Sequence, residues 1–461
     1  MQFLLSAGEA SGDTYGAQLA EAIRGLAPSA QFFGMGGEKM RAAGCELLVH
    51  ANEVAVVGLV EVVTHLPAIR RRFRDLVAEA ARRKPDAAVL IDFPDFNLRL
   101  ARELHRLGIP VFYFVSPQVW AWRTGRVKQI RKYVRKMIVI FPFEQEFYRR
   151  HGVDVSYVGH PLAFAAAPQI SRAEFATKHG LDPKKQWIAL LPGSRRKEVR
   201  LNLPPMLEAA ELLRRQGNFQ FVLPVASTLS QDWLRQELDR CSSAAKAGER
   251  TGSHRRPLPQ QAKTGLVGGP EDLLHPAKPE VLLDAARPEG LLHPAHPSGE
   301  VDMSREKDCL SNGPLIHFAD NARATLMHAR AAVVASGTAT VEAALSGTPF
   351  VVVYRLAPLT WLLGRRLVKL STFAMPNLIA GEKIVPELIQ GNFTAANVLR
   401  ELKAIIPDGP ARGKMQDALK MVQTKLHDSR DAEPPAQRAA REIIGSLGGV
   451  SGDQRADIER D

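Results

Sequence analysis

Cysteine is scarce in this chain of 461 residues, and its three cysteines, Cys45, Cys241 and Cys309, lie far apart. No Cys-x-x-Cys pair occurs. This pattern argues against a zinc site and against a disulfide framework. We therefore expect no metal site in the protein.

Long apolar runs are also missing. No stretch reaches the roughly 18 uninterrupted apolar residues that suggest a transmembrane helix. The start, Met1 to Ser6, has no basic region and too short an apolar run for a signal peptide. These absences predict a protein that stays in the cytoplasm. Its length is enough for two or more domains, each with a full core.

Acidic residues are absent from one strongly charged segment. The net charge of the chain is +12, and every charged residue from Arg123 to Lys136 is Arg or Lys. A second basic cluster extends from Arg70 to Lys84. Such clusters are compatible with a nucleic acid, an anionic membrane, a phosphorylated substrate or simply a solvated helix face. Nucleic-acid binding is disfavoured, because no aromatic platform and no helix-turn-helix or RNA-binding signature accompanies them.

What is present is an alternation of short apolar runs and helical patterns, in two series. This alternation implies βαβ units and parallel sheets. We predict a first domain of residues 1–165, a second of residues 166–407, and a helical segment and tail at 408–461. The predicted strands are Phe3–Ser6, Gln31–Gly34, Ala87–Asp92, Val111–Ser116, Met137–Phe141 and Val155–Val158 in the first series, and Trp187–Leu191, Gln220–Pro224, Leu315–Phe318, Ala331–Ala335 and Phe350–Tyr354 in the second.

Residues 241–313 interrupt the second series. They are rich in Pro, Gly, Ser, Ala and charge, and they contain a near-duplicate, Leu273–Pro279 and Leu291–Pro297. Such a segment cannot bury enough apolar surface to offset the entropy lost on ordering. We predict a mostly disordered surface insertion in the second domain.

Two turns in the second domain predict a site for an anion. Each follows a predicted strand and leads into a helix, in the runs Leu190–Arg195 and Ala335–Glu342. Such turns direct backbone N–H groups and the positive end of a helix toward a ligand. A nucleotide diphosphate fits two of them best. The expected contacts are Ser194, the N–H groups of Ser336, Gly337 and Thr338, the forked cation of Arg195, and Glu342 on a ribose.

Which cation contacts the diphosphate stays open, since Arg196 and Lys197 follow Arg195 directly.

In the first domain, Glu9, Asp92 and Ser116 each follow a predicted strand. Ligands of open parallel sheets bind beyond the carboxyl ends of the strands. We therefore expect these three residues to converge on one crevice.

Seven runs of this sequence, in order, resemble those of lipid-A-disaccharide synthases: AGEASGD, IDFPDFN, YFVSPQVWAWR, VGHPL, LLPGSRRKEV, ASGTATVEAAL and MPNLIAG. The resemblance covers roughly residues 1–235 and 314–430, and the insertion departs from it. It implies an α/β protein of GT-B fold, with two Rossmann-like, doubly wound domains facing across a cleft. It also implies an inverting glycosyltransferase without a cofactor, which moves a diacylated glucosamine from UDP to the 6-hydroxyl of a diacylated glucosamine 1-phosphate (lipid X).

The resemblance assigns roles to individual residues. The catalytic aspartate of the family maps to Asp92, which we expect to be the base, with Glu9 orienting it or the acceptor. From the sequence alone, Asp92 is as well explained as the N-cap of the following helix, and Glu9 as a turn residue. Asn377 maps near the donor sugar or phosphates, or it is a buried turn asparagine.

Two other functions stay open at this point. One is another UDP-sugar transferase or an epimerase of the same fold, and the other is a UDP-sugar-binding protein without turnover. The intact Asp92 argues against the second, because a pure binder needs no base.

Acylated substrates require contact with a membrane. We expect a peripheral contact with the inner face of the inner membrane, through apolar residues that adjoin arginines. Core packing of residues 56–63 is the alternative, and a homodimer is possible. The expected contact residues are Val62, Val63, Leu66, Ile69, Arg70, Arg71 and Arg72.

Overall fold

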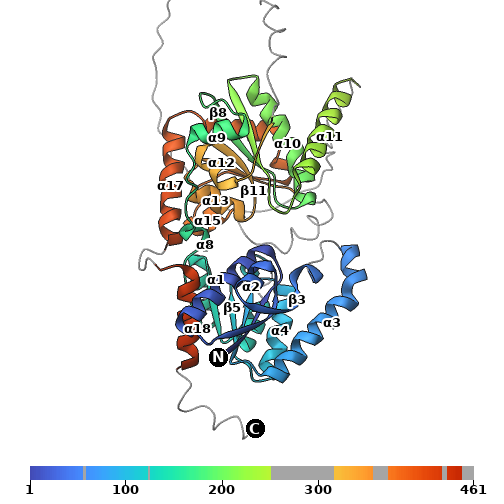
Figure 1. The fold of residues 1–461 in the computed structure, drawn as a ribbon. Coiled ribbons are helices and arrows are strands. Elements are labelled where there is room, and N and C mark those ends of the chain that lie inside the picture. The colour runs from blue at the N-terminus through green and yellow to red at the C-terminus, as the bar shows by residue number, and fades with distance from the viewer. Residues whose placement is uncertain (55–58, 123–124, 251–315, 357–371, 428–432, 449–461) are drawn as a thin grey trace, which may run out of the picture. The chain divides into compact units, whose positions relative to one another are not determined.

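Two parallel sheets with helices on both faces organise the chain (Figure 1). The structure is a computed structural model, and it describes residues 1–54, 59–122, 125–250, 316–356, 372–427 and 433–448. Both sheets belong to one compact unit. The two doubly wound parallel sheets expected from the sequence are present.

The first sheet has seven parallel strands in the order β3-β2-β1-β4-β5-β6-β7. The strands are β1 (Gln2–Ala7), β2 (Gln31–Gly36), β3 (Cys45–His50), β4 (Ala87–Ile91), β5 (Val111–Phe114), β6 (Lys136–Val139) and β7 (Val155–Tyr157). Its helices are α1 (Ala10–Leu26), α2 (Glu38–Ala42), α3 (Leu59–Arg83), α4 (Pro94–Arg106), α5 (Val119–Trp122), α6 (Arg126–Tyr133) and α7 (Pro142–Arg150).

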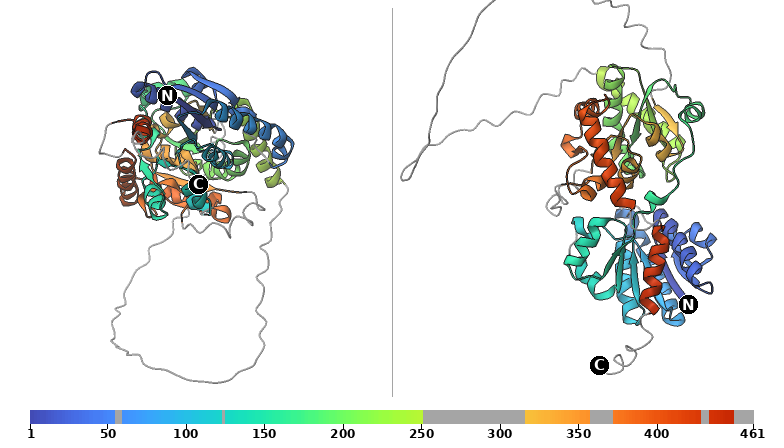
Figure 2. Two further views of the ribbon diagram at one scale, coloured as in Figure 1. Left: turned by 90° about the horizontal axis from the view of Figure 1, so that it is seen from below. Right: turned by 90° about the vertical axis from the view of Figure 1, so that its left-hand side faces the viewer.

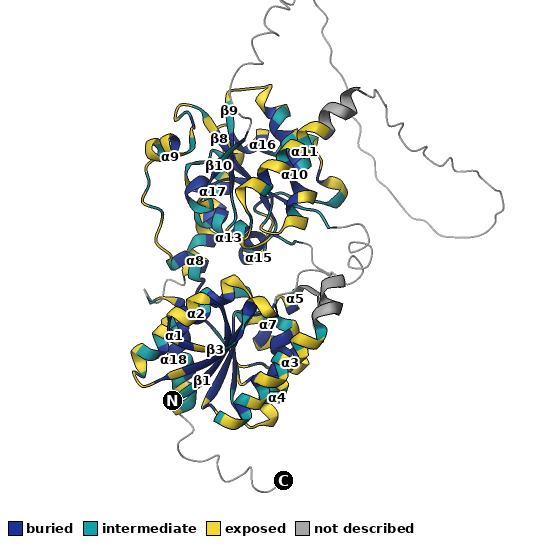
Figure 3. Ribbon diagram, turned by 45° about the vertical axis from the view of Figure 1, so that its right-hand side comes forward, coloured by how far each residue is buried: buried dark blue, intermediate teal, exposed yellow. Residues whose placement is uncertain are grey.

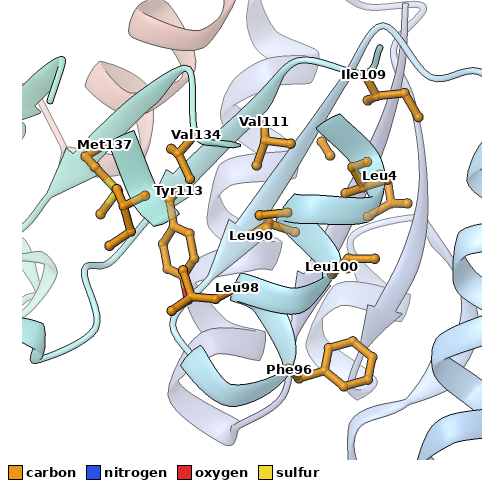
Figure 4. Packing of buried hydrophobic residues seen from close by; sticks show 14 of the residues in the cluster. Leu4, Leu90, Phe96, Leu98, Leu100, Ile109, Val111, Tyr113, Val134 and Met137 are labelled. Carbon is orange, nitrogen blue, oxygen red and sulfur yellow. The ribbon is translucent and has the colours of Figure 1, made fainter. Parts of the chain in front are cut away.

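Alternate residues of each strand of the first sheet enter two different cores, as the period of a strand requires. Leu4 and Leu90 pack in a cluster with residues of α3, α4, α6 and α7 (Figure 4). Their neighbours Phe3 and Val89 pack on the other face, with α1 and α2. Strands buried on both faces form near-continuous apolar runs, and Figure 3 shows the strands in the colour of buried residues.

The second sheet has six parallel strands in the order β10-β9-β8-β11-β12-β13. The strands are β8 (Gln186–Leu191), β9 (Phe219–Pro224), β10 (Ile316–Ala319), β11 (Ala331–Ala335), β12 (Phe350–Tyr354) and β13 (Glu387–Ile389). Its helices, with those that join it to the first sheet, are α8 (Pro161–Phe164), α9 (Arg172–His179), α10 (Arg196–Arg214), α11 (Gln231–Arg250), α12 (Ala322–His328), α13 (Thr338–Leu345), α15 (Met375–Ala380), α16 (Ala395–Ile405) and α17 (Pro410–His427).

The C-terminal helix α18 (Pro435–Gly448) belongs to the core of the first sheet (Figure 2). Ala439, Ala440 and Ile443 are fully buried in the same cluster as the residues of α1. An ion pair of 2.7 Å between Lys136 Nζ and Glu442 fixes it to β6. The end of the chain therefore contributes to the domain that contains its beginning.

The predicted strands agree with the observed ones to within about two residues at each end. Helix α11 continues to Arg250, so the first residues of the predicted insertion, from Cys241 on, are helical. The run from Ala244 to Arg250 has three alanines, and its Lys, Glu and Arg also favour a helix. Residues 251–313 of the insertion lie outside the described residues.

The order of the strands decides where a ligand can bind. The helix after β1 covers one face of the first sheet and the helix after β4 covers the other, although β1 and β4 are neighbours. Doubly wound sheets bind ligands at such a switch point. The equivalent pair in the second sheet is β8 and β11. None of the helices in the described ranges is long and apolar enough to cross a membrane.

Candidate functional site

Asp92 follows β4 directly, at the switch point of the first sheet. Its φ is 45°, and that of Phe93 is 50°. Both values lie in the left-handed region, which costs a non-glycine residue on the order of 1–3 kcal/mol. Strain of this kind persists only where the surroundings enforce it, and it clusters at functional sites.

A buried set of hydrogen bonds enforces the backbone at Asp92. The Asp92 carbonyl accepts from Asn97 Nδ2 at 2.8 Å and from the Tyr113 hydroxyl at 2.6 Å. Asn97 Nδ2 also donates to the carbonyls of Ser6 and Ile91, and Ser6 Oγ donates to Asn97 Oδ1 at 2.7 Å. Ser6, Asn97 and Tyr113 are fully buried. The ends of β1, β4 and β5 are thus connected to α4 around one peptide group.

The environment of the Asp92 carboxyl suits a general base. Its pKa is raised to about 7, first by burial and then by the charge of Glu9, while the Phe93 N–H and Arg195 oppose the shift. A base with a pKa near the working pH transfers protons most effectively. The alternative role as a helix cap is not observed, because Phe93 occupies the N-cap position of α4 and no side chain caps it.

Glu9 occupies the N-cap position of α1, but its side chain makes no cap hydrogen bond. Its Oε1 lies 3.9 Å from Arg195 Nη2. The nearby acid Asp13 has a structural role instead, because its Oδ1 accepts from the N–H groups of Gly37 and Met40. Glu9 is therefore the acid of this segment that reaches the same neighbourhood as Asp92.

The first predicted anion turn is rigidly built. Gly193 has a φ of 122°, and a Cβ there would meet Glu198 Oε2 at 2.7 Å, so only glycine fits. Ser194 N donates to the same oxygen at 3.2 Å, and Thr228 Oγ1 donates to the Ser194 carbonyl. The turn places Arg195 at the start of α10.

The structure distinguishes Arg195 from Arg196. The Arg195 guanidinium is mostly exposed, 3.5 Å from Glu198 and 3.9 Å from Glu9. The Arg196 guanidinium lies over the Trp233 ring, 5.3 Å from its centroid, where a cation–π contact stabilises it. This geometry favours Arg195 as the cation that meets a diphosphate.

The second predicted anion turn needs a correction. The Ser336 N–H donates to the Val353 carbonyl of β12 at 2.9 Å, so it is not available to a ligand. Gly337 (φ 146°) and Thr338 are exposed at the start of α13. Their N–H groups are the donors that this turn offers to an anion.

Glu342 lies in the second turn of α13, and burial raises its pKa. Its charge also acts on Tyr15 of α1: the pKa of that phenol is raised to about 12 by burial first and then by Asp92 and Glu342. The carboxylates of Asp92 and Glu342 therefore both act on Tyr15.

Two predicted ligand residues are already occupied by contacts within the protein. Asn377 is buried: its Nδ2 donates to the Val385 carbonyl and to Glu387, and its Oδ1 accepts from the N–H groups of Ile384 and Val385. These contacts correspond to the buried turn asparagine that the sequence left as an alternative. The buried Ser116 hydroxyl forms a hydrogen bond of 2.8 Å with Tyr148.

The predicted membrane residues divide into two groups on α3. Ile69 packs against the first core, and Arg72 is paired with Glu53 at 2.7 Å, so both have partners within the protein. Arg70 and Arg71 are exposed, and Leu66 is half-buried. The side chains of Val62 and Val63 lie outside the described residues.

Sequence reasoning missed three residues of this region: Asn97, Tyr113 and Glu144. Glu144, on α7, is 1% exposed, and burial raises its pKa to about 8. Its only signal in the sequence is an acid three residues after Phe141, at the start of a helix. Within the described residues, no three His, Cys, Asp or Glu side chains form a group that could hold a metal ion.

Comparison with known proteins identifies the relatives of the chain. The family model for lipid-A-disaccharide synthetase matches residues 3–247 and 301–441. The chain is 47% identical to the lipid-A-disaccharide synthase of Koribacter versatilis over 96% of its length and 98% of that protein. It is 46% identical to that of Acidobacterium capsulatum, over 92% of its length and 91% of that protein.

Solved structures of glycosyltransferases share the fold. A glycosyltransferase of kitacinnamycin superposes with a TM-score of 0.54 at 12% identity, covering 97% of this chain and 98% of that one. The calicheamicin glycosyltransferase gives 0.52 at 14% identity, covering 98% and 99%. At such identities the likeness concerns the fold alone, and it confirms the GT-B arrangement expected from the sequence.

The shifted carboxyl of Asp92 generates a first prediction. Glu9→Gln removes a negative charge that raises the pKa of Asp92, so the base loses its proton at lower pH. The acid limb of kcat/KM for UDP release, expected near pH 7, should move down by up to about one pH unit. Glu21→Gln, on the exposed side of the same helix, is the control and should leave the limb in place. If the acid limb does not move in Glu9→Gln, the charge of Glu9 does not raise the pKa of Asp92.

The different surroundings of the two arginines generate a second prediction. Arg195→Ala should weaken UDP binding roughly 10- to 100-fold, because one charge-assisted hydrogen bond to the diphosphate is lost. Arg196→Ala removes the same charge from the next residue and should weaken UDP binding only a few-fold. Isothermal titration with UDP measures both. The reverse order of affinities would assign the diphosphate to Arg196.

Proposed function

The chain belongs to the lipid-A-disaccharide synthase family, and on that premise we propose that it condenses UDP-2,3-diacylglucosamine with lipid X. The products are a β-1,6-linked disaccharide 1-phosphate and UDP. The observation that carries the proposal is the pair formed by a partly buried, strained Asp92 with a pKa of about 7 and the nearby exposed Arg195. The first can accept a proton, and the second can neutralise a leaving diphosphate.

The reaction is a single displacement. The 6-hydroxyl of lipid X gives its proton to the Asp92 carboxylate, and its oxygen attacks the anomeric carbon of the donor from the face opposite UDP. The bond from that carbon to the diphosphate oxygen breaks, and UDP leaves with the electron pair. The configuration at the anomeric carbon is inverted, and no covalent intermediate with the enzyme forms.

The leaving diphosphate develops negative charge, and groups of the second domain stabilise that charge. Arg195 and the N–H groups of Gly337 and Thr338 supply positive ends for the diphosphate, and fixed donors of this kind stabilise developing charge strongly. Glu342 accepts hydrogen bonds from the ribose hydroxyls. In this proposal, groups of the protein itself meet the charge of the leaving diphosphate.

The strained backbone has a use in this mechanism. Because two buried donors fix the Asp92 carbonyl, the carboxyl is held in one place while the acceptor approaches. Positioned reactants avoid an entropic cost that otherwise slows the reaction. Asn97 and Tyr113 act as positioning residues for the base.

The third prediction tests the function. Asp92→Asn keeps the shape of the side chain but cannot take a proton, so kcat should fall about 10²–10⁴-fold while UDP binding changes little. UDP release is measured with the diacylated donor plus lipid X, and with plain UDP-N-acetylglucosamine. Asp95→Asn, on the exposed surface three residues later, is the control. Turnover of the plain donor alone would point to another UDP-sugar enzyme, and near-parental turnover of Asp92→Asn would remove Asp92 from the mechanism.

We also infer that the enzyme works in contact with the inner face of the inner membrane, because both substrates carry acyl chains. The exposed Arg70 and Arg71 and the half-buried Leu66 support this placement. Ile69 and Arg72 contribute less, since their side chains are engaged by the protein. A homodimer stays a prediction.

The fourth prediction concerns this membrane contact. A variant with Leu66→Ser, Arg70→Gln and Arg71→Gln should sediment less with anionic liposomes. Its binding constant for the liposomes should fall roughly thirtyfold if each arginine contributes about 1 kcal/mol. Binding by the parent should also weaken as salt shortens the Debye length from about 10 Å at 0.1 M to about 3 Å at 1 M. Turnover of detergent-solubilised substrate should stay near the parental value.

The control for this variant is Arg214→Gln with Arg215→Gln, which removes the same charge from the C-terminal end of α10 and the residue that follows it. These arginines pair with Glu211 on the second domain. Equal losses of liposome binding in both variants would mean that net charge, and not the surface of α3, attracts the membrane.

A further inference from the structure

A carboxylate of the second domain lies against the first anion turn (Leu190–Arg195). Glu198 Oε2 accepts from the Ser194 N–H at 3.2 Å, and a Cβ on Gly193 would meet the same oxygen at 2.7 Å. Glu198 Oε1 lies 3.5 Å from Arg195 Nη1. The two oxygens of one carboxylate therefore face an N–H group and a guanidinium, the two kinds of donor that this turn offers to a phosphate.

This turn lies at the switch point of the second sheet. β8 and β11 pair in parallel, with Leu191 opposite Val334, so the chain leaves both strands at the same edge of the sheet. The second anion turn (Ala335–Glu342) follows β11 there. Glu198 therefore lies beside the strand ends to which we assign the donor diphosphate.

The backbone of the first anion turn is held from two sides. Asn202, which is 1% exposed, donates from Nδ2 to the Pro192 carbonyl at 2.9 Å. Thr228 Oγ1 donates to the Ser194 carbonyl at 2.5 Å. The Glu198 side chain, in contrast, is 33% exposed. A partly exposed side chain changes its rotamer far more readily than a fixed turn changes its backbone, so Glu198 is the part that can make room for a ligand.

The two anion turns differ in this carboxylate. The first turn of helix α10 carries Glu198, whereas the first turn of α13 has no acidic residue. The start of a helix attracts negative charge, whether it belongs to a carboxylate or to a phosphate. Two anions on the same N–H group and the same guanidinium repel each other. Glu198 and a bound phosphate therefore exclude each other from the first anion turn.

We propose that Glu198 competes with the donor diphosphate for the Ser194 N–H and Arg195, and that it thereby lowers the affinity for UDP. The donor displaces the carboxylate when it binds, and the carboxylate returns to these groups when UDP leaves. The donor carries a sugar and acyl chains that UDP lacks, so weaker binding of the diphosphate favours release of the product. This inference rests on the proposed function, because it takes Arg195 as the cation that meets the diphosphate.

Two other roles of Glu198 compete with this one. Glu198 can simply cap α10, as Glu174 caps α9, where it accepts from the Ser171 N–H at 2.8 Å and is exposed. Alternatively, it can hold the Arg195 guanidinium in place for the diphosphate. The three roles predict different signs. Loss of a competitor strengthens UDP binding, loss of a cap leaves it unchanged, and loss of a support for Arg195 weakens it.

The test compares Glu198→Gln with the parent and with Glu174→Gln by isothermal titration with UDP. Glutamine keeps an oxygen that accepts from the Ser194 N–H but removes the charge, so Tm should stay near the parental value. Glu198→Gln should bind UDP roughly tenfold more tightly at low salt, because one like charge is removed from beside the diphosphate. Glu174→Gln removes the same charge from the cap of α9 and should leave the affinity for UDP within about twofold of the parental value.

The ligand and the salt concentration locate the effect. Uridine has no phosphate, so its affinity, measured by competition with UDP, should be the same in Glu198→Gln and in the parent. The gain for UDP should shrink at about 1 M salt, where the Debye length is about 3 Å. UDP should also leave Glu198→Gln more slowly than it leaves the parent, because most affinity changes appear in the dissociation rate.

An unchanged or weaker affinity of Glu198→Gln for UDP would overturn the proposal. An equal gain for uridine, or an equal gain for UDP in Glu174→Gln, would overturn it as well. If Glu198→Gln does not fold, Glu198→Ala decides by the same titrations, because it also removes the charge. A parent that does not bind UDP at all would count against the donor site of the proposed function, which distinguishes the two failures.

Discussion

The geometry at the first switch point depends on the side chain of Asn97. Its amide reaches the carbonyl of Ser6 at the end of β1 and those of Ile91 and Asp92 at the end of β4. An apolar residue in its place would remove this donor from the Ser6 and Ile91 carbonyls, at about 1–3 kcal/mol each, and would leave the Asp92 carbonyl with the Tyr113 hydroxyl alone. The same bonds offset the left-handed backbone of Asp92. Stability of the sheet and placement of the base therefore have one origin, and the strain is held where the chemistry needs a fixed carboxyl.

Burial raises the pKa of two acids in the first domain, Asp92 and Glu144. Glu144 is buried and Asp92 is partly buried, and burial is the largest cause that raises their pKa values, to about 8 and about 7; Asp92 adds to the shift of Glu144, and Glu9 adds to that of Asp92. Desolvation and like charge act in the same direction on carboxyls. Asp92 has Arg195 as an opposing influence, whereas Glu144 has only hydrogen-bond donors. Near neutral pH, Asp92 is thus the acid more readily available in its charged form.

Much of this was predictable from the sequence, for identifiable reasons. Central strands are buried on both faces, so their apolar runs stand out, and β4 with Asp92 after it was predicted correctly in position. The edge strands β3 and β13 were missed, because β3 carries a partly exposed face and β13 has only three residues. The engaged N–H of Ser336 was not foreseeable, since it depends on the pairing of β11 with β12. Asn97, Tyr113 and Glu144 escaped for the same reason: each acts on a residue that the fold alone brings near.

The two sheets repeat one topology but end in opposite chemistry. The strand ends of the first carry Glu9 and Asp92, and those of the second carry Arg195 and the N–H groups of Gly337 and Thr338. A displacement that takes a proton at one substrate and releases a diphosphate at the other needs this division, because one site cannot favour both charges. The ion pair between Glu9 and Arg195, at 3.9 Å between exposed groups, is long and weak. In the proposed mechanism, a diphosphate therefore replaces Glu9 as the partner of Arg195 at small cost.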